Sequence, residues 1–474
     1  MAKSKDYLFI LLGIITIWFG LLLYNQNAAP TQTILLASII YFLCCLPTVI
    51  YFYSKDSTIP YLPFFGIFYF VYFGLSIFSN YKIFLDINVY NFSYSLINTC
   101  LIYALAGFLS MMVAFYSPIV TIAEKARLVS PLTVAWDIKK AYKIALVLGV
   151  IGNIAYYFTV IRSLPVFYMG IITFLGELSR LSFVILYMIQ SRGELNFKGK
   201  LFLWFIVFIP RILLSMTTGT TFAIIIDFVL LFFIDLYYRQ RLPWKRIILA
   251  AVMFFFVFSA RDKYRDMVWY RSGTQVYDTA PKRIKLYFNL IYDEVTQNKE
   301  TYTYTYEKLS ARADYMVTFV SVVALTPDYI PFWDGYTYQT LFTSIIPRVI
   351  MPDKPLKNVG QSFGHRYGFL EPWDTSTAYN LPFLIEMYVN FGAMGIIVGM
   401  FILGIVFRIF YILLNTKVSG EGIIAIGAMI FSNLLNVESD LSLMFGHMLQ
   451  YIILFYIIIK WASRSPARNR YTAT

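Results

Sequence analysis

The sequence predicts an all-α polytopic membrane protein. Of its 474 residues, 59% are hydrophobic and only 14% are charged, and the mean hydropathy is +0.65. Soluble globular chains have an apolar share nearer one half. The apolar runs are about 20 residues long, the length of a membrane-spanning helix, and they lack the alternation of a barrel strand. Because backbone polar groups in lipid must be paired within each segment, we expect the spans to be helices.

Apolar runs bounded by charged residues predict about twelve spans. In chain order they are 7–24, 31–53, 60–78, 94–117, 141–161, 165–190, 201–216, 219–238, 246–260, 392–414, 421–436 and 441–461. This pattern divides the chain into three parts. A bundle of nine spans covers 1–260, one large extracytoplasmic loop covers 261–378, and a re-entrant segment followed by three spans covers 379–474.

The basic residues predict the orientation. With the N-terminus inside, the inside loops and the C-terminal tail hold eighteen Lys and Arg, whereas the short outside loops hold only Lys82 and Arg162. Under the positive-inside rule both termini are then cytoplasmic. The net charge of +13 follows this topology and forms no basic arm, so no nucleic-acid partner is expected.

The sequence offers no sign of a cofactor. Cys44, Cys45 and Cys100 all fall inside apolar runs, where cysteine is usually a small buried hydrophobe, and no metal-ligand spacing is present. There is no phosphate-binding glycine loop, no dinucleotide fingerprint and no nucleophile elbow. We therefore expect neither a metal nor a nucleotide.

The large loop is chemically mixed, with fourteen Lys and Arg beside thirteen Asp and Glu. Residues 306–325 have helical spacing of apolar side chains, and 326–338 are rich in Pro, Gly and aromatics and should be irregular. Those aromatics would lie at the lipid interface or stack on sugar rings. The lipid interface is the more common place for any one of them.

Several cations of this loop are candidates for binding a diphosphate, because a guanidinium fork matches phosphate oxygens and stays charged. Arg261 and Arg265 would share one helical face just beyond the ninth span, where the alternative is contact with lipid headgroups. Arg312 lies in the helix-patterned segment. Arg348 and Lys354 stand among three prolines that stiffen the backbone, and the alternative there is a local ion pair.

A second group of candidates follows. His365, Arg366 and Tyr367 stand between Gly364 and Gly368, and flanking glycines let a backbone turn sharply or approach a ligand closely. A histidine in such a place is a candidate proton or phosphate partner. The other reading is a loop histidine hydrogen-bonded to its surroundings.

Carboxylates occur further on. Asp374 precedes a segment in which Glu386 and Asn390 lie one helical turn apart on one face. If the chain re-enters the membrane here, Glu386 should face a cavity near the outer boundary, because a carboxylate pointing at lipid is costly.

Four charges fall within predicted spans. Glu177 and Arg180, at i and i+3, are expected to pair structurally, whereas Arg211 and Asp227 either pair across the bundle or line the same outer cavity.

These motifs carry a resemblance. Pro-Arg-x-x-x-Pro-Asp-Lys-Pro at 347–355, Gly-His-Arg-Tyr-Gly at 364–368, Asp-Thr-Ser-Thr at 374–377 and Glu-x-Tyr-x-Asn-Phe-Gly-x-x-Gly at 386–395 resemble the bacterial O-antigen polymerase family, the Wzy-type oligosaccharide repeat-unit polymerases. The similarity covers about 311–408, and the N-terminal spans match only in hydropathy.

The resemblance implies a metal-independent glycosyltransferase with a glycosyltransferase-C-like helical bundle. Its substrates would be undecaprenyl-diphosphate-linked oligosaccharides at the outer face of the bacterial cytoplasmic (inner) membrane, its surroundings membrane lipids, and its partner a chain-length regulator. The product would be O-antigen or capsule polysaccharide.

In such a reaction, Arg312, Arg348 and Arg366, with Arg265, would stabilise the leaving diphosphate. Asp374 or Glu386 would act as the base, with His365 as substitute. Two rivals stay open. An O-antigen ligase would use the same donor with lipid A core as acceptor, and a lipid-linked oligosaccharide flippase or other transporter would use the intramembrane charges and would be expected to show repeated halves.

Overall fold

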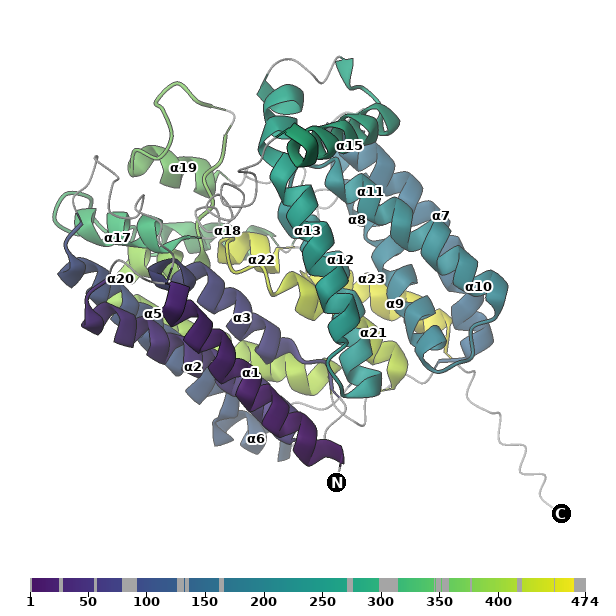
Figure 1. Cartoon of the computed structure of the whole chain (residues 1–474), viewed down its shortest axis with the longest axis horizontal. Coiled ribbons are helices and arrows are strands. Elements are labelled where there is room, and N and C mark those ends of the chain that lie inside the picture. Colours follow the sequence, from purple (N-terminus) through teal and green to yellow (C-terminus); the bar gives the residue numbers. More distant parts are fainter. Residues whose placement is uncertain are drawn as a thin grey trace.

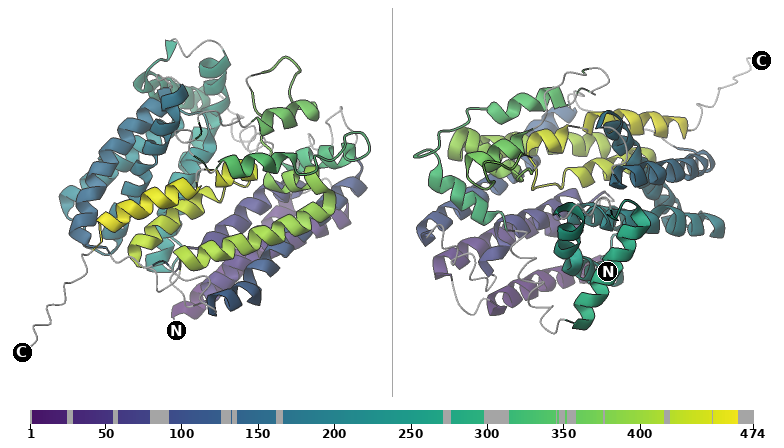
Figure 2. Two further views of the ribbon diagram at one scale, coloured as in Figure 1. Left: turned by 180° about the vertical axis from the view of Figure 1, so that it is seen from behind. Right: turned by 90° about the horizontal axis from the view of Figure 1, so that it is seen from above.

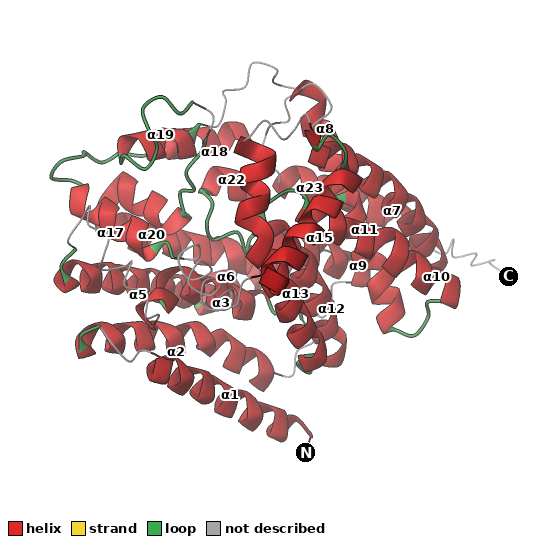
Figure 3. Cartoon of the chain, turned by 45° about the horizontal axis from the view of Figure 1, so that its top comes forward, coloured by secondary structure: helices red, strands yellow, loops and turns green. Residues whose placement is uncertain are grey.

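The computed structural model is a helical bundle whose described part contains no β-strand (Figures 1 and 3). It describes residues 2–24, 29–54, 58–78, 92–125, 132, 136–161, 166–270, 276–297, 314–344, 346, 351, 358–375, 377–415, 420–446 and 448–463. A single isolated β-bridge joins Trp136 and Ser463.

Helices make up most of the described residues. They are α1 (Ala2–Tyr24), α2 (Thr31–Tyr53), α3 (Tyr61–Phe73), η1 (Leu75–Phe78), α5 (Tyr94–Tyr116), α6 (Pro118–Lys125), α7 (Ile138–Ile161), α8 (Val166–Gly176), α9 (Leu178–Ser191), α10 (Phe197–Leu201), η2 (Phe202–Phe208), α11 (Ile209–Met216), α12 (Thr221–Arg239), α13 (Trp244–Arg265), η3 (Asp266–Tyr270), α15 (Ala280–Gln297), α17 (Met316–Leu325), η4 (Tyr336–Tyr338), α18 (Gln339–Ser344), α19 (Val359–Arg366), α20 (Phe383–Leu414), α21 (Glu421–Asn433), α22 (Leu441–Phe445) and α23 (Met448–Trp461).

In the described part of the chain, eight segments are long and apolar enough to cross a membrane, as expected of a polytopic membrane protein. They are Thr31–Tyr53, Tyr94–Val120, Ile138–Ile161, Tyr168–Ser191, Phe197–Met216, Thr221–Arg239, Phe383–Leu414 and Leu441–Trp461. Each coincides with a span that the apolar runs predict. The predicted spans near 7–24, 60–78 and 421–436 correspond to shorter apolar helices, and 246–260 lies within α13.

Small residues let the central helices approach closely. α5 and α20 pack along their length, and a Cβ atom at Gly404 of α20 would lie 2.4 Å from the carbonyl oxygen of Met111 on α5. At Gly152 of α7, a Cβ atom would lie 2.2 Å from the backbone nitrogen of Ser179 on α9. Any larger residue at either position would push the two helices apart.

Hydrogen bonds define two ends of the bundle. At the end that we call the Asn415 end, Ile59 and Asn415 exchange two hydrogen bonds, and Glu421 accepts from Arg192 and Tyr238. Loops that the charge pattern places on one side of the membrane therefore meet here.

The opposite end is called the Glu386 end. There the backbone N–H of Leu441 donates to Glu386 at 2.7 Å, Tyr315 bonds to the backbone of Tyr72, and the Tyr315 hydroxyl donates to Glu438. α19 lies at the upper left of Figure 1 and α15 at the upper right, both away from the start of α1 at the bottom, and Figure 2 shows the chain from behind and from above.

α20 is broken near the Glu386 end. Phe391 (φ −142°, ψ 18°) and Gly392 (φ 63°, ψ −152°) are not helical, so residues 383–390 form a short helix of their own before the long span begins. The left-handed φ of Gly392 is a conformation that residues with a Cβ atom rarely adopt. The break sets Glu386 and Asn390 apart from the span, at the place where the sequence predicts a span to start.

The large loop also follows part of its predicted outline. The helix that contains the ninth predicted span, α13, continues to Arg265, and the π-helix η3 follows it. Within the segment predicted to be helical, the structure describes α17. Of residues 326–338, which were expected to be irregular, 326–335 are so, as their proline and glycine content predicts, whereas 336–338 form the short 3-10 helix η4. The boundaries at 260 and 378 depend on where the membrane lies, so the division of the chain into three parts stays a prediction.

Candidate functional site

A tight turn covers the first segment of α20. Asp334 (φ 47°) and Gly335 (φ 88°) both have positive φ, which reverses the chain within two residues. Two hydrogen bonds hold the turn on α20. The Trp333 N–H donates to the carbonyl of Val389 at 2.8 Å, and the Gly335 N–H donates to the side chain of Asn390 at 2.9 Å. The sequence Asp-Gly thus positions Trp333 and Tyr336 on the outer side of this turn.

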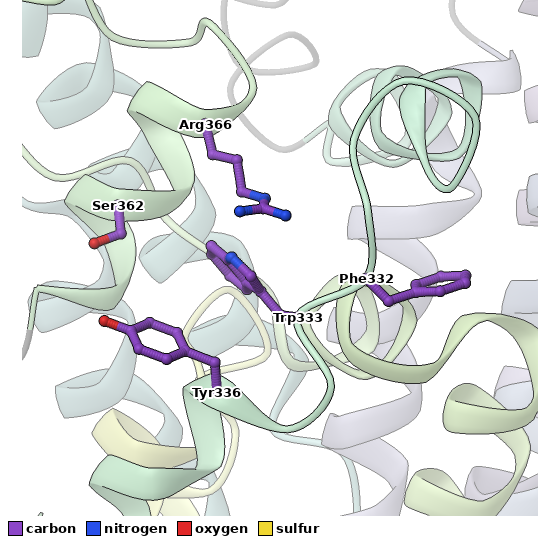
Figure 4. Close-up of a pocket in the computed structure, with 5 residues that line it drawn as sticks. All are labelled: Phe332, Trp333, Tyr336, Ser362 and Arg366. Carbon is purple, nitrogen blue, oxygen red and sulfur yellow. The ribbon is translucent and has the colours of Figure 1, made fainter.

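A cavity of about 460 Å³ lies between this turn and α19 (Figure 4). Its walls are Phe332, Trp333, Tyr336, Ser362 and Arg366. This volume is within the range of small-molecule sites in proteins. Figure 4 shows the Arg366 guanidinium beside the Trp333 indole, with the Tyr336 ring on the facing wall.

Arg366 is held in place but keeps hydrogen-bonding capacity. Its Nη2 donates to the carbonyl of Pro331 at 2.8 Å, and the guanidinium carbon lies 5.4 Å from the centre of the Trp333 ring. The Nε atom is buried and, among the described residues, has no hydrogen-bond partner. The arginine is thus oriented by one carbonyl and one aromatic face and can donate further hydrogen bonds to an anion.

The arrangement suits a ligand that combines a sugar with a phosphate. Flat aromatic faces make good contact with the C–H faces of a pyranose ring, and tyrosine and tryptophan add polar groups at their edges. A guanidinium binds phosphate oxygens through paired N–H groups. A serine hydroxyl, from Ser362, can donate or accept.

Glu386 lies beneath the turn and not in this cavity. It is fully buried, its Oε2 accepts from the Leu441 N–H, and its Oε1 has no hydrogen-bond partner in the described residues. Asn390 connects the first segment of α20 with the turn above it, since its Nδ2 donates to the Glu386 carbonyl at 2.7 Å and to the Thr337 hydroxyl at 2.8 Å. Burial and the nearby Glu386 carboxylate raise the pKa of the Tyr338 phenol.

Asp374 stabilises a local turn. Its Oδ1 accepts from the Thr377 N–H at 2.9 Å, an arrangement that aspartate commonly forms at turns. Tyr367 packs against Phe363 and Phe369, and its hydroxyl shares a hydrogen bond with Thr326 at 2.7 Å. Neither residue lines the cavity, and nor does His365, which is partly buried on the last turn of α19.

The predicted diphosphate-binding cations divide into three sets. Arg366 lines the cavity. Arg265 is the last residue of α13. Its guanidinium carbon lies 4.2 Å from the centre of the Trp269 ring, and its side chain packs against the backbone at Gly219. The other three, Arg312, Arg348 and Lys354, lie outside the described residues.

Sequence reasoning did not single out Trp333, Tyr336, Phe332 or Ser362. The aromatic richness of 326–338 was the available signal, and it fits the lipid interface equally well. Only the folded turn shows that three of those aromatic residues, Phe332, Trp333 and Tyr336, line the same cavity as Arg366. Among the described residues, no three His, Cys, Asp or Glu side chains are grouped so that they could hold a metal ion.

The intramembrane charges form one network. Arg180 bonds to Asp227 at 2.6 Å and to Glu177 at 2.9 Å, and Arg211 bonds to Glu177 at 3.2 Å and lies 3.6 Å from Asp227. Two positive and two negative charges thus balance within the bundle. The predicted pairing of Glu177 with Arg180 is present, and Arg211 and Asp227 join that pair.

Comparison with known proteins gives one match. A family model described as a domain of unknown function, DUF8712, matches residues 58–461. No curated protein and no solved structure matches the chain.

Proposed function

Because the chain belongs to the DUF8712 family, whose model carries no activity, we propose a function from its own residues: a membrane-embedded glycosyltransferase that polymerises oligosaccharide repeat units carried on undecaprenyl diphosphate. The proposal includes a glycosyltransferase-C-like bundle of twelve spans in the bacterial cytoplasmic membrane. Both termini are in the cytoplasm, and the Glu386 end is at the outer face. The product is a surface polysaccharide, O-antigen or capsule, whose length a partner regulates.

The cavity at the Glu386 end carries this proposal. It places a guanidinium with unused donors beside aromatic rings, at one end of a bundle of apolar helices. The resemblance of residues 311–408 to O-antigen polymerases supports the same substrate class. On the outer face no nucleotide sugar is available, so an activated sugar must arrive on a lipid.

In the proposed reaction, the bond between the anomeric carbon of the growing glycan and its diphosphate breaks as a hydroxyl of the incoming lipid-linked unit attacks that carbon. The transition state resembles an oxocarbenium ion, and the diphosphate takes the bonding electrons and leaves on its lipid. Arg366 binds and stabilises the diphosphate, which is already a good leaving group. Trp333 and Tyr336 hold the sugar next to it.

A base accepts the proton of the attacking hydroxyl. Asp374, Glu386 and His365 are the candidates. His365 stands on the same helical turn as Arg366. Glu386 is fully buried, and it needs a rearrangement of the turn at 333–338 to reach an acceptor. Asp374 already accepts from the Thr377 N–H through one oxygen.

The experiment that tests the function incubates purified protein with synthetic undecaprenyl-diphosphate oligosaccharides and resolves the products on a gel. We expect a ladder of multiples of the repeat unit. Arg366→Ala should yield single-repeat species only. The control is Lys282→Ala on α15, which removes an exposed ion pair with Asp278 and should give the wild-type ladder. A second reaction that offers lipid A core as acceptor distinguishes a ligase. No glycosidic product with either acceptor refutes the proposal.

A further inference from the structure

A second cavity, of about 440 Å³, lies at the opposite end of α20, the Asn415 end. It is formed where the C-terminal parts of α2, α5 and α20 meet the segment 58–63. Its walls are mostly apolar and aromatic, and they include Tyr51, Phe115, Tyr116 and Tyr411. Arg408 is the single charged side chain among the described residues of its lining.

Hydrogen bonds hold these walls in place. The Tyr51 hydroxyl donates to the carbonyl of Thr58 at 2.9 Å, and the Tyr411 hydroxyl donates to the Thr58 hydroxyl at 3.0 Å. Ile59 and Asn415 are joined by two further hydrogen bonds of 2.7 and 2.9 Å. The cavity is therefore built into the fold, because the ends of α2 and α20 are both tied to the segment that closes it.

Arg408 has no counter-ion among the described residues. Its guanidinium carbon lies 5.4 Å from the ring centres of both Phe115 and Tyr411, and its buried Nε has no hydrogen-bond partner there. Arg180 and Arg211, which also lie within spanning segments, are each paired with carboxylates, whereas Arg408 is not. An arginine within a spanning helix needs a partner charge or water, because lipid solvates it poorly.

Arg408 lies near the Asn415 end of its apolar helix. It precedes the end of α20 at Leu414 by six residues, about 9 Å along the helix axis. Long basic side chains near the end of a spanning helix extend toward the headgroup region. Tyr116 is 46% exposed, so one wall of the cavity opens toward the surroundings of the bundle.

We propose that this cavity binds an anionic glycerophospholipid, with its phosphate on Arg408 and the start of its acyl chains against the aromatic walls. A free phosphate ion shares the first contact but gains nothing from apolar walls, so the lining favours a lipid. The inference concerns the end of the bundle away from Arg366, and it does not depend on the proposed glycosyltransferase.

The test counts lipids bound to the detergent-purified full chain by native mass spectrometry, with phosphatidylglycerol, phosphatidylcholine or inorganic phosphate added. Wild type should retain phosphatidylglycerol in preference to phosphatidylcholine. Arg408→Gln should weaken phosphatidylglycerol binding about tenfold, the effect of losing one hydrogen bond to a charged group. Arg239→Gln, which removes the same charge from a half-exposed position on α12, should bind as wild type does.

Three results would overturn the inference. They are equal retention of the two lipids by wild type, an unchanged preference in Arg408→Gln, and saturation of the site by inorganic phosphate at the concentration at which phosphatidylglycerol binds. If Arg408→Gln does not fold, Arg408→Lys answers the same question. It keeps the charge but loses the planar contact with two rings, so the preference should persist with reduced affinity.

Discussion

Replacement of Arg211 by methionine tests the buried charge network most severely. Arg211 is 3% exposed, and its Nη1 donates to the carbonyl of Gly176 at 2.8 Å and to the Ser179 hydroxyl at 2.9 Å. Its guanidinium also lies 3.5 Å from the centre of the Tyr156 ring. Methionine keeps much of the volume but removes the positive charge, so Arg180 alone faces two carboxylates.

The magnitude follows from that imbalance. Breaking a buried ion pair by removing one partner costs about 3–5 kcal/mol, because the remaining charge stays buried. This is about two to four orders of magnitude in the ratio of folded to unfolded protein. The double variant Arg211→Met with Asp227→Asn restores neutrality and keeps an oxygen for the Ser215 hydroxyl, which donates to Asp227 at 3.0 Å. We therefore expect it to be more stable than Arg211→Met alone.

Unfolding of the purified protein in mixed micelles, titrated with a denaturing detergent, measures the change. Lys282→Met is the control, since its ion pair with Asp278 is exposed and such pairs contribute little. Two results would refute the reasoning: an Arg211→Met variant as stable as the control, or a double variant less stable than the single one.

Two further predictions concern the Glu386 end. Gly392→Ala should destabilise the protein by about 1–3 kcal/mol and reduce polymer formation, since φ 63°, ψ −152° is nearly restricted to glycine and Phe332 lies 3.1 Å from the added Cβ. Gly20→Ala, with open space around it on α1, should keep or slightly raise stability in the same unfolding titration, because alanine has the higher helix propensity, and equal stabilities of the two variants would contradict the argument. Burial raises the pKa of Asp314 to about 7, although the hydrogen bond with Ser76 lowers it, so the folded protein binds this proton more tightly than the unfolded chain. Stability should therefore fall as pH rises from about 4 to about 7, and Asp314→Asn should remove this contribution. An identical pH dependence in the variant would refute it.

The helices could be predicted from sequence because their signal is local. An apolar run of about 20 residues specifies a spanning helix whatever its neighbours are, and so α2 begins and ends at the predicted residues. The helical turn that joins Glu386 and Asn390 was predictable for the same reason, since it depends only on their spacing.

The sequence pattern identified Arg366 as a candidate, but it did not predict the geometry around it. An arginine framed by glycines suggested anion binding, and Arg366 lines a cavity. Which aromatics meet it depends on the turn at Asp334 and Gly335 and on its hydrogen bonds to α20, which no local pattern reveals. In the same way, four charges from three spans form one network only through tertiary packing, and the lack of a counter-ion for Arg408 among the described residues is visible only in the folded chain.

The central claim is that the cavity at the Glu386 end binds the diphosphate of a lipid carrier through Arg366. The most direct measurement is the affinity of undecaprenyl diphosphate for the purified protein and for Arg366→Ala, determined by titration in nanodiscs of uncharged lipid. The account predicts affinity at least about tenfold weaker for Arg366→Ala, with the unfolding midpoint unchanged. Equal affinity of the two folded proteins for undecaprenyl diphosphate would contradict it.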